Sequence, residues 1–223
     1  MARIFISREL KDNPLWVEQC LKLGHAVIGY SCIETISKPF EYNTPADWIF
    51  FSSSEGVHHF IKQKPKISSR IAAMGMGTAQ TLKQYNYEAE FIGQSAEPEN
   101  VAFDFQNNIL SGQTILFPQS KQTRNSIAPH LKNCKIERLT VYSTESRKVM
   151  PTNADLYIFS SPSNVDSYFN QHPIDLSKPM IAFGPATEAR IKEKGCQNIL
   201  ALKNVSGEEI FHAIKVSLLG LEG

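Results

Sequence analysis

Serine and threonine residues follow short apolar segments at several points where the chain is predicted to pass from a strand into a helix. They are Ser53, Thr78, Ser161, Ser163 and Thr187. Hydroxyl groups beside the free N–H groups of a helix start can bind an anion without a strong local positive charge. The same residue types are common helix caps, and Ser52 and Glu55 have the spacing of a capping box. The pattern therefore supports either an anion site or capping.

Tyr142 stands at the end of another apolar segment, in Leu-Thr-Val-Tyr-Ser-Thr. A phenol at a strand end can donate a hydrogen bond to a leaving group, although half-buried packing explains such a tyrosine equally well. Basic residues that could bind a carboxylate, or could simply be surface charges, are Arg8, Lys121, Arg124 and Arg147.

Patterns of other site classes are missing from the sequence. Gly75-Met-Gly-Thr lacks the third glycine of a dinucleotide fingerprint, because position 80 is Gln. There is no GxSxG or GxxxxGK[ST] motif, and the six histidines form no metal-ligand pattern, so we expect no metal site. The cysteines at 20, 32, 134 and 196 contain no CxxC motif, which favours free thiols in a reducing, cytoplasmic compartment.

The composition indicates an ordinary globular protein. The chain has 223 residues, of which 42% are hydrophobic and 20% charged, with a formal net charge of +1. This charge gives no global field to attract nucleic acid or an anionic membrane. No apolar stretch approaches the roughly 18 residues that a spanning helix needs. We therefore expect neither a nucleic-acid partner nor a membrane partner.

Short apolar segments alternate with helical patterns along the chain. The predicted strands are residues 4–6, 26–30, 47–51, 71–74 and 89–92, and the predicted helices are 14–23, 55–61, 78–85 and 99–110. Strands that alternate with helices through short joints are typical of an α/β fold with parallel sheets.

The chain also contains an internal repeat. The segment from Asp47 to Val57 aligns with the segment from Asp155 to Val165 at an offset of 108, and Asp, Phe, two Ser and Val coincide. Gly75 and Thr78 align with Gly184 and Thr187 at an offset of 109. The repeat predicts two similar α/β units, with a ligand cleft between them as the default site.

The ordered set of short motifs resembles the uroporphyrinogen-III synthase family over the whole chain. The motifs are Asp47-x-Ile-Phe-Phe-Ser-Ser, Gly75-x-Gly-Thr-Ala, Leu116-Phe-Pro with Arg124, Val141-Tyr-Ser-Thr, Phe159-Ser-Ser-Pro-Ser and Gly184-Pro-x-Thr. The resemblance implies two flavodoxin-like parallel-sheet domains, one inserted in the other and joined by a two-stranded linker. Residues 1–34 and 146–223 would form the first domain, and residues 37–141 the second.

The activity that the resemblance implies is the cyclisation of hydroxymethylbilane, a linear tetrapyrrole, with inversion of its last ring and loss of water. The family uses no metal and no organic cofactor. The free bilane closes by itself without inversion, so the enzyme mainly folds the substrate and stabilises developing charge. No strong nucleophile is required.

The resemblance also implies roles for individual residues. Tyr142 would assist departure of the hydroxyl group. The substrate's carboxylates would be held by Ser53, Thr78, Ser161, Ser163, Thr187, Arg8 and Arg124. Glu55 departs from the family pattern, because relatives can carry a basic residue there. Two small domains with an unremarkable surface composition predict a monomer, and the cysteine pattern predicts a cytoplasmic location. The sequence leaves open a transient contact with the preceding enzyme of the pathway.

Two other readings of the sequence remain. A non-catalytic, two-domain cytosolic protein could bind a small polyanion with the same helix starts. A nucleotide-dependent transferase is the other alternative, and the incomplete glycine fingerprint counts against it.

Overall fold

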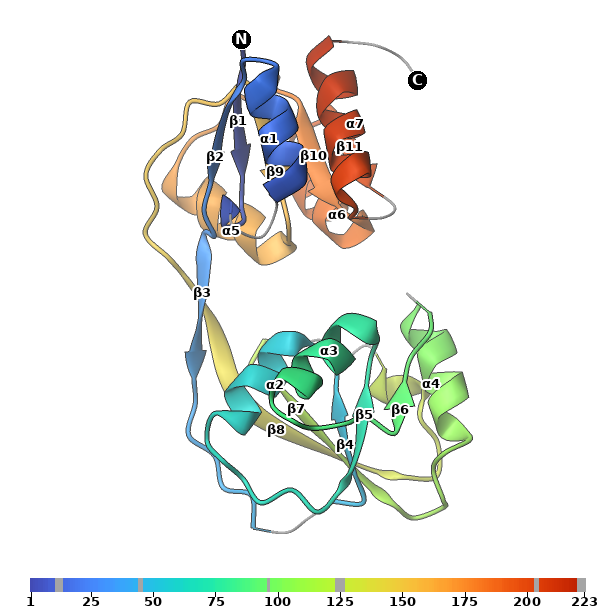
Figure 1. The fold of residues 1–223 in the computed structure, drawn as a ribbon. Coiled ribbons are helices and arrows are strands. Elements are labelled where there is room, and N and C mark those ends of the chain that lie inside the picture. Colours follow the sequence, from blue (N-terminus) through green and yellow to red (C-terminus); the bar gives the residue numbers. More distant parts are fainter. Residues whose placement is uncertain (11–13, 44–45, 96, 123–126, 203–204, 220–223) are drawn as a thin grey trace. The chain divides into compact units, whose positions relative to one another are not determined.

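The computed structural model describes residues 1–10, 14–43, 46–95, 97–122, 127–202 and 205–219 (Figure 1). The chain forms two compact units. The first unit comprises Met1–Glu34 and Glu145–Gly223, and the second comprises Thr35–Thr144. The chain therefore leaves the first unit, completes the second and then returns.

The first unit contains a five-stranded parallel sheet in the order β11-β10-β9-β1-β2. Its strands are β1 (Arg3–Ile6), β2 (Ala26–Gly29), β9 (Leu156–Phe159), β10 (Met180–Phe183) and β11 (Ile199–Leu202). This is a flavodoxin-like order, in which the direction of winding reverses between β1 and β9. The carboxyl ends of those two strands are the usual ligand-binding position in such sheets.

Helices cover both faces of this sheet (Figure 1). Successive side chains of a strand point to opposite faces, so apolar strands such as β1 supply a core on each side. Ile4 and Ile6 of β1 face α1 (Pro14–Lys22) and α7 (Gly207–Leu219), where they pack with Trp16 and Ile210. Phe5 points the other way, into the core beneath α5 (Pro162–Gln171) and α6 (Pro185–Glu193).

The second unit has a six-stranded sheet in the order β3-β8-β7-β4-β5-β6. Its strands are β3 (Ile33–Ser37), β4 (Trp48–Phe51), β5 (Arg70–Ala73), β6 (Phe91–Ile92), β7 (Thr114–Ser120) and β8 (Lys135–Ser146). Helices α2 (Ser54–Ile61) and α3 (Met76–Gln84) cover one face, and α4 (Pro98–Gln106) with the short helix η2 (Ala128–His130) covers the other.

The two sheets share one spatial order of strands. Reading β2-β1-β9-β10-β11 against β8-β7-β4-β5-β6 pairs every strand of the first sheet with an equivalent in the second. Asp47 and Asp155, the two aspartates of the internal repeat, make equivalent contacts. Asp155 accepts a hydrogen bond from the Arg3 main chain at 2.8 Å, and Asp47 accepts one from the Thr114 main chain at 2.7 Å.

The expected α/β fold with parallel sheets is confirmed, and some boundaries differ. The helix predicted for residues 99–110 ends at Gln106, where two successive asparagines, which are weak helix formers, follow. The strand predicted for residues 89–92 is reduced to Phe91–Ile92. None of the described helices is long and apolar enough to cross a membrane.

Candidate functional site at the carboxyl edges of the sheets

The predicted serines lie at the carboxyl ends of equivalent strands. Ser53 is the N-cap of α2 and accepts a hydrogen bond from the Gly56 main chain at 3.2 Å. Ser161 is the N-cap of α5 and accepts one from the Asn164 main chain at 3.3 Å. The predicted Ser52–Glu55 capping box is wrong by one residue, because Ser53 has the extended backbone of the cap.

The two predicted threonines occupy the third position of equivalent helices, so neither is an N-cap. The caps are Gly75 for α3 and Gly184 for α6. Gly184 has a φ of 88°, a conformation that favours glycine. Thr187 is buried and its hydroxyl donates to the Phe183 carbonyl at 3.2 Å. Thr78 is also buried.

Tyr142 lies on β8 beside the start of α2, in the core of the second unit beneath α2 and α3. The residue is 8% exposed. Burial raises the pKa of the Tyr142 phenol, the hydrogen-bonding Ser53 side chain lowers it to a smaller extent, and the Glu55 carboxylate raises it. The phenol is therefore protonated at neutral pH and can act as a proton donor.

His59 and Glu55 of α2 complete the surroundings of this tyrosine. The His59 and Tyr142 rings stack with centroids 4.8 Å apart. His59 Nε2 lies 3.4 Å from Glu55 Oε2. His59 was not among the residues predicted from the sequence, although a glutamate four residues before a histidine places both on one helix face.

Arg8 follows β1 in the first unit. Its guanidinium lies 5.5 Å from the centre of the Phe183 ring, at the carboxyl end of β10. Ser163 is exposed in the first turn of α5. Arg124 lies outside the described residues. The structure thus brings Arg8 close to the strand that precedes Thr187.

The switch point of the first sheet is filled by a polar network. Ser7 and Ser160 follow β1 and β9, and their hydroxyl oxygens are 3.1 Å apart. The Asn164 side chain donates to Ser161 Oγ at 3.0 Å and accepts from the Cys32 main chain at 2.8 Å. These side chains bind one another and the main chain, so they fix the geometry of this edge.

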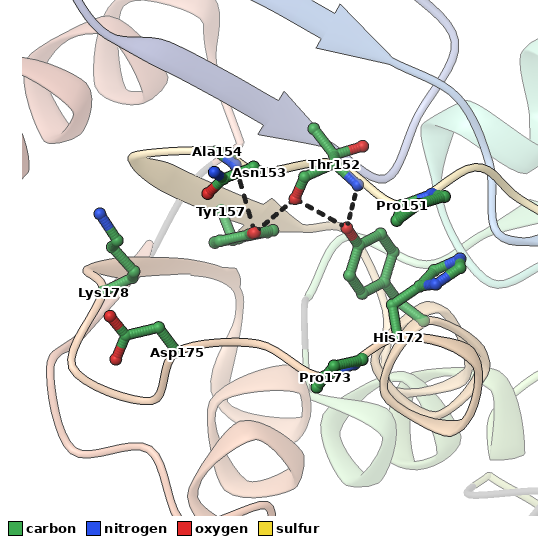
Figure 2. A pocket seen from close by; sticks show the side chains of 10 residues that line it. Pro151, Thr152, Asn153, Ala154, Tyr157, His172, Pro173, Asp175 and Lys178 are labelled. Carbon is green, nitrogen blue, oxygen red and sulfur yellow. Dashed lines mark hydrogen bonds between the residues drawn. The ribbon is translucent and has the colours of Figure 1, made fainter.

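A pocket of about 210 Å³ opens at the other end of the same sheet, before β9 and β10 (Figure 2). The Tyr157 hydroxyl donates to the Thr152 carbonyl at 2.6 Å and accepts from the Ala154 main chain at 3.2 Å. The Tyr168 hydroxyl likewise bonds the Thr152 main chain. Both phenols are occupied, and none of the predicted site residues lines this pocket.

Metal-ligating side chains do not gather in the described ranges. No group of three or more His, Cys, Asp or Glu side chains there could hold a metal ion. The site chemistry consists of hydroxyl groups, main-chain N–H groups, one buried phenol and a neutral histidine, since burial lowers the pKa of His59.

Comparison with known proteins gives one family and one fold. A family model described as uroporphyrinogen-III synthase HemD matches residues 15–211. The chain is similar to the solved uroporphyrinogen-III synthetase from Helicobacter pylori, with a TM-score of 0.73 and 15% identity over 99% of this chain and 100% of that chain. It is also similar to a mutant uroporphyrinogen III synthase from the extremely thermophilic bacterium Thermus thermophilus, with a TM-score of 0.60 and 14% identity over 99% and 100%. No curated protein sequence gives a significant match.

Proposed function

Because the chain belongs to the uroporphyrinogen-III synthase family, whose members close hydroxymethylbilane with loss of water, we propose that Tyr142 donates a proton to the departing hydroxyl group. The chain is a cyclising lyase of tetrapyrrole biosynthesis. The observation that carries the role of Tyr142 is its buried, protonated phenol beside Ser53 at the carboxyl edge of the second sheet.

The proton balance of the reaction suits a single phenol. Expulsion of water requires one proton on the hydroxyl group, and the ring carbon that forms the last bond loses one proton. A residue that gives the first proton can therefore recover the second. A phenol whose pKa is raised by burial holds its proton until the leaving oxygen develops negative charge.

Binding of the substrate's carboxylates is assigned to the helix starts at both edges. Ser53, Ser161 and the first-turn Ser163 and Thr187 lie beside main-chain N–H groups that favour negative charge. Thr78 adds a buried residue with a hydroxyl group in the first turn of α3. Arg8 adds a fixed positive charge beside Phe183. Arg124 is retained in this role on the strength of the motif alone.

Glu55 makes the second unit less suited than the first to binding the substrate's carboxylates. Its side chain is 49% exposed and stands two residues after Ser53, so it repels a carboxylate at the α2 start. In the first unit, the position equivalent to Glu55 is Ser163. The start of α5 therefore lacks the negative charge that Glu55 gives to α2, and Arg8 provides a positive charge in the same unit. We therefore assign most of the carboxylate binding to the first unit and the departure of water to the second.

The organisation of the molecule is part of the same proposal. The two domains are residues 1–34 with 146–223, and 37–141, linked by β3 and β8. We propose that the protein acts as a monomer in the cytoplasm. Its four unpaired cysteines favour such a reducing compartment.

An isomer assay tests the proposal. Hydroxymethylbilane is generated in place, the products are oxidised, and chromatography gives the ratio of isomer III to isomer I. We expect predominant isomer III, against a control without protein that gives mostly isomer I. A ratio equal to the control, with folded protein, would contradict the activity and favour a polyanion-binding protein.

A further inference from the structure

The Tyr142 ring is held in place by a second ring, and the inference drawn from this contact rests on the proposed role of Tyr142. The His59 ring lies against it with centroids 4.8 Å apart and an angle of 17° between the planes. Both residues are 8% exposed. A stacked pair of this kind fixes both ring planes, because neither ring can rotate without the other moving.

His59 is itself held by groups on two elements. Its Nδ1 lies 2.7 Å from Ser37 Oγ on β3, and its Nε2 lies 3.4 Å from Glu55 Oε2 on α2. Thr35 on β3 donates a hydrogen bond to the same Glu55 oxygen, at 2.9 Å. The lowered pKa of His59 favours the neutral imidazole. With Nε2–H facing the Glu55 carboxylate, Nδ1 of that neutral ring accepts from the Ser37 hydroxyl.

The charges around His59 agree with a neutral ring. Burial is the main cause of its lowered pKa, and Glu55 raises the pKa in opposition. Lys62, the C-cap of α2, and His58 on α2 lower it further. The contact from β3 to His59 comes from Ser37, which is neutral, and neutral Thr35 of the same strand bonds Glu55. The contact from β8 is the Tyr142 phenol, which is protonated.

We propose that His59, held by Glu55 on α2 and Ser37 on β3, is a positioning residue that orients the Tyr142 phenol toward the departing hydroxyl group. The arrangement also gives Glu55 a task. It orients an imidazole at the place where relatives can use a basic residue on substrate. Strand β3 enters the site through Ser37 and Thr35, whose side chains fix this network.

A double-mutant cycle tests the proposal. His59→Leu should lower kcat for isomer III about tenfold with KM changed less than about twofold, because an off-rotamer phenol is poorly aligned. In a Tyr142→Phe background the same substitution should cost less than about 1.5-fold, since its effect acts through the phenol. Equal losses in both backgrounds would overturn the proposal.

A spectroscopic measurement keeps the test independent of activity. With tyrosine labelled by ¹³C at Cζ, His59→Leu and Ser37→Ala should each shift the Tyr142 resonance. The matched control is His58→Leu, because His58 faces Tyr85 instead and its Nδ1 lies 2.7 Å from that hydroxyl. His59→Phe retains the stack and should shift the resonance less than His59→Leu.

An unchanged Tyr142 resonance in folded His59→Leu or Ser37→Ala would overturn the positioning role whatever the activity. If the parent protein makes no isomer III, the proposed function fails, and the spectrum still decides whether His59 orients the ring. If His59→Leu does not fold, Ser37→Ala gives the kinetic and spectroscopic readouts in its place.

Discussion

The two units share a sheet order and a serine cap, yet the tyrosine that follows β2 in the first unit and the tyrosine on β8 in the second have different surroundings. In the first unit, the Tyr30 hydroxyl donates to the Met150 carbonyl and lies 2.8 Å from Thr152 Oγ1. In the second unit, the neighbours of Tyr142 are the side chains of Ser53, Glu55 and His59. The Tyr30 hydroxyl thus bonds other groups of the protein, whereas the Tyr142 phenol lies beside side chains that can take part in proton transfer.

Two positions of the repeat also differ between the units. Ser167 stands where the second unit has His59, and its hydroxyl donates to the Cys32 carbonyl. Asn164 stands where the second unit has Gly56, and its amide bonds three further groups. In the first unit, these polar groups thus form hydrogen bonds with one another and with the main chain. The second places a histidine and a glutamate beside the phenol.

The largest expected effect comes from removing each phenol hydroxyl in turn. Tyr142→Phe should lower kcat for isomer III about 10²-fold, the lower end of the range for general acids. Tyr30→Phe should change kcat less than about threefold and act mainly on stability, since its hydroxyl bonds the protein. Steady-state kinetics with isomer analysis measures both variants. Equal effects on kcat would remove the distinction between the tyrosines.

The next effect concerns positions 164 and 56. Asn164→Ala should lower the free energy of unfolding by about 2–3 kcal/mol, because the buried Cys32 N–H loses its acceptor. Gly56→Ala should cost about 1–2 kcal/mol by overpacking, since its Cβ would stand 2.9 Å from the Pro118 carbonyl oxygen. Denaturant unfolding measures both. A neutral Asn164→Ala would show that the polar network at the switch point contributes no stability.

The equivalent caps give a smaller effect on stability and a sharper one on kinetics. Ser53→Ala and Ser161→Ala should each cost about 1 kcal/mol of unfolding free energy. Ser53→Ala should also lower kcat, because Ser53 borders the phenol. Ser161→Ala should mainly raise KM, because most of the carboxylate binding is assigned to the first unit and Glu55 repels a carboxylate beside Ser53. The same kinetic change in both variants would contradict this division of labour.

The smallest effect depends on pH. Hydrogen bonding to the Arg3 main chain lowers the pKa of Asp155, so its contribution is full above the unfolded pKa of about 3.9 and is lost as pH falls through the lower folded value. Asp155 is exposed, and the contribution should stay below about 1 kcal/mol. The stability difference between the parent and Asp155→Asn, measured by unfolding from pH 7 to pH 2.5, should shrink only below about pH 4. A constant difference would contradict the contact.

Much of the fold was predictable because the pattern is local. Alternating apolar segments such as residues 47–51 give the strands, and the recurrence of Asp, Ser and Val at an offset of 108 gives the second copy. Helix ends are less predictable. Whether Ser52 or Ser53 caps α2 depends on one extended backbone conformation.

The surroundings of Tyr142 were only partly predictable. Tyr142 and Ser53 emerged from motifs, and Glu55 was noticed as a departure. His59 was not predicted, because its role depends on a contact with β3, which lies about 20 residues earlier in the chain. Sheet pairing with β8 brings β3 to α2. Contacts of this kind depend on register, and register is set by the whole sheet.

Binding of the oxidised product, uroporphyrin III, to protein labelled at tyrosine Cζ tests the division between the two units most directly. The chain has 7 tyrosines, which Tyr→Phe substitutions assign one by one. We predict that saturating uroporphyrin III shifts the Tyr142 resonance and leaves those of Tyr30, Tyr157 and Tyr168 in place. A shifted Tyr30 with an unmoved Tyr142 would contradict the assignment of the reacting edge to the second unit.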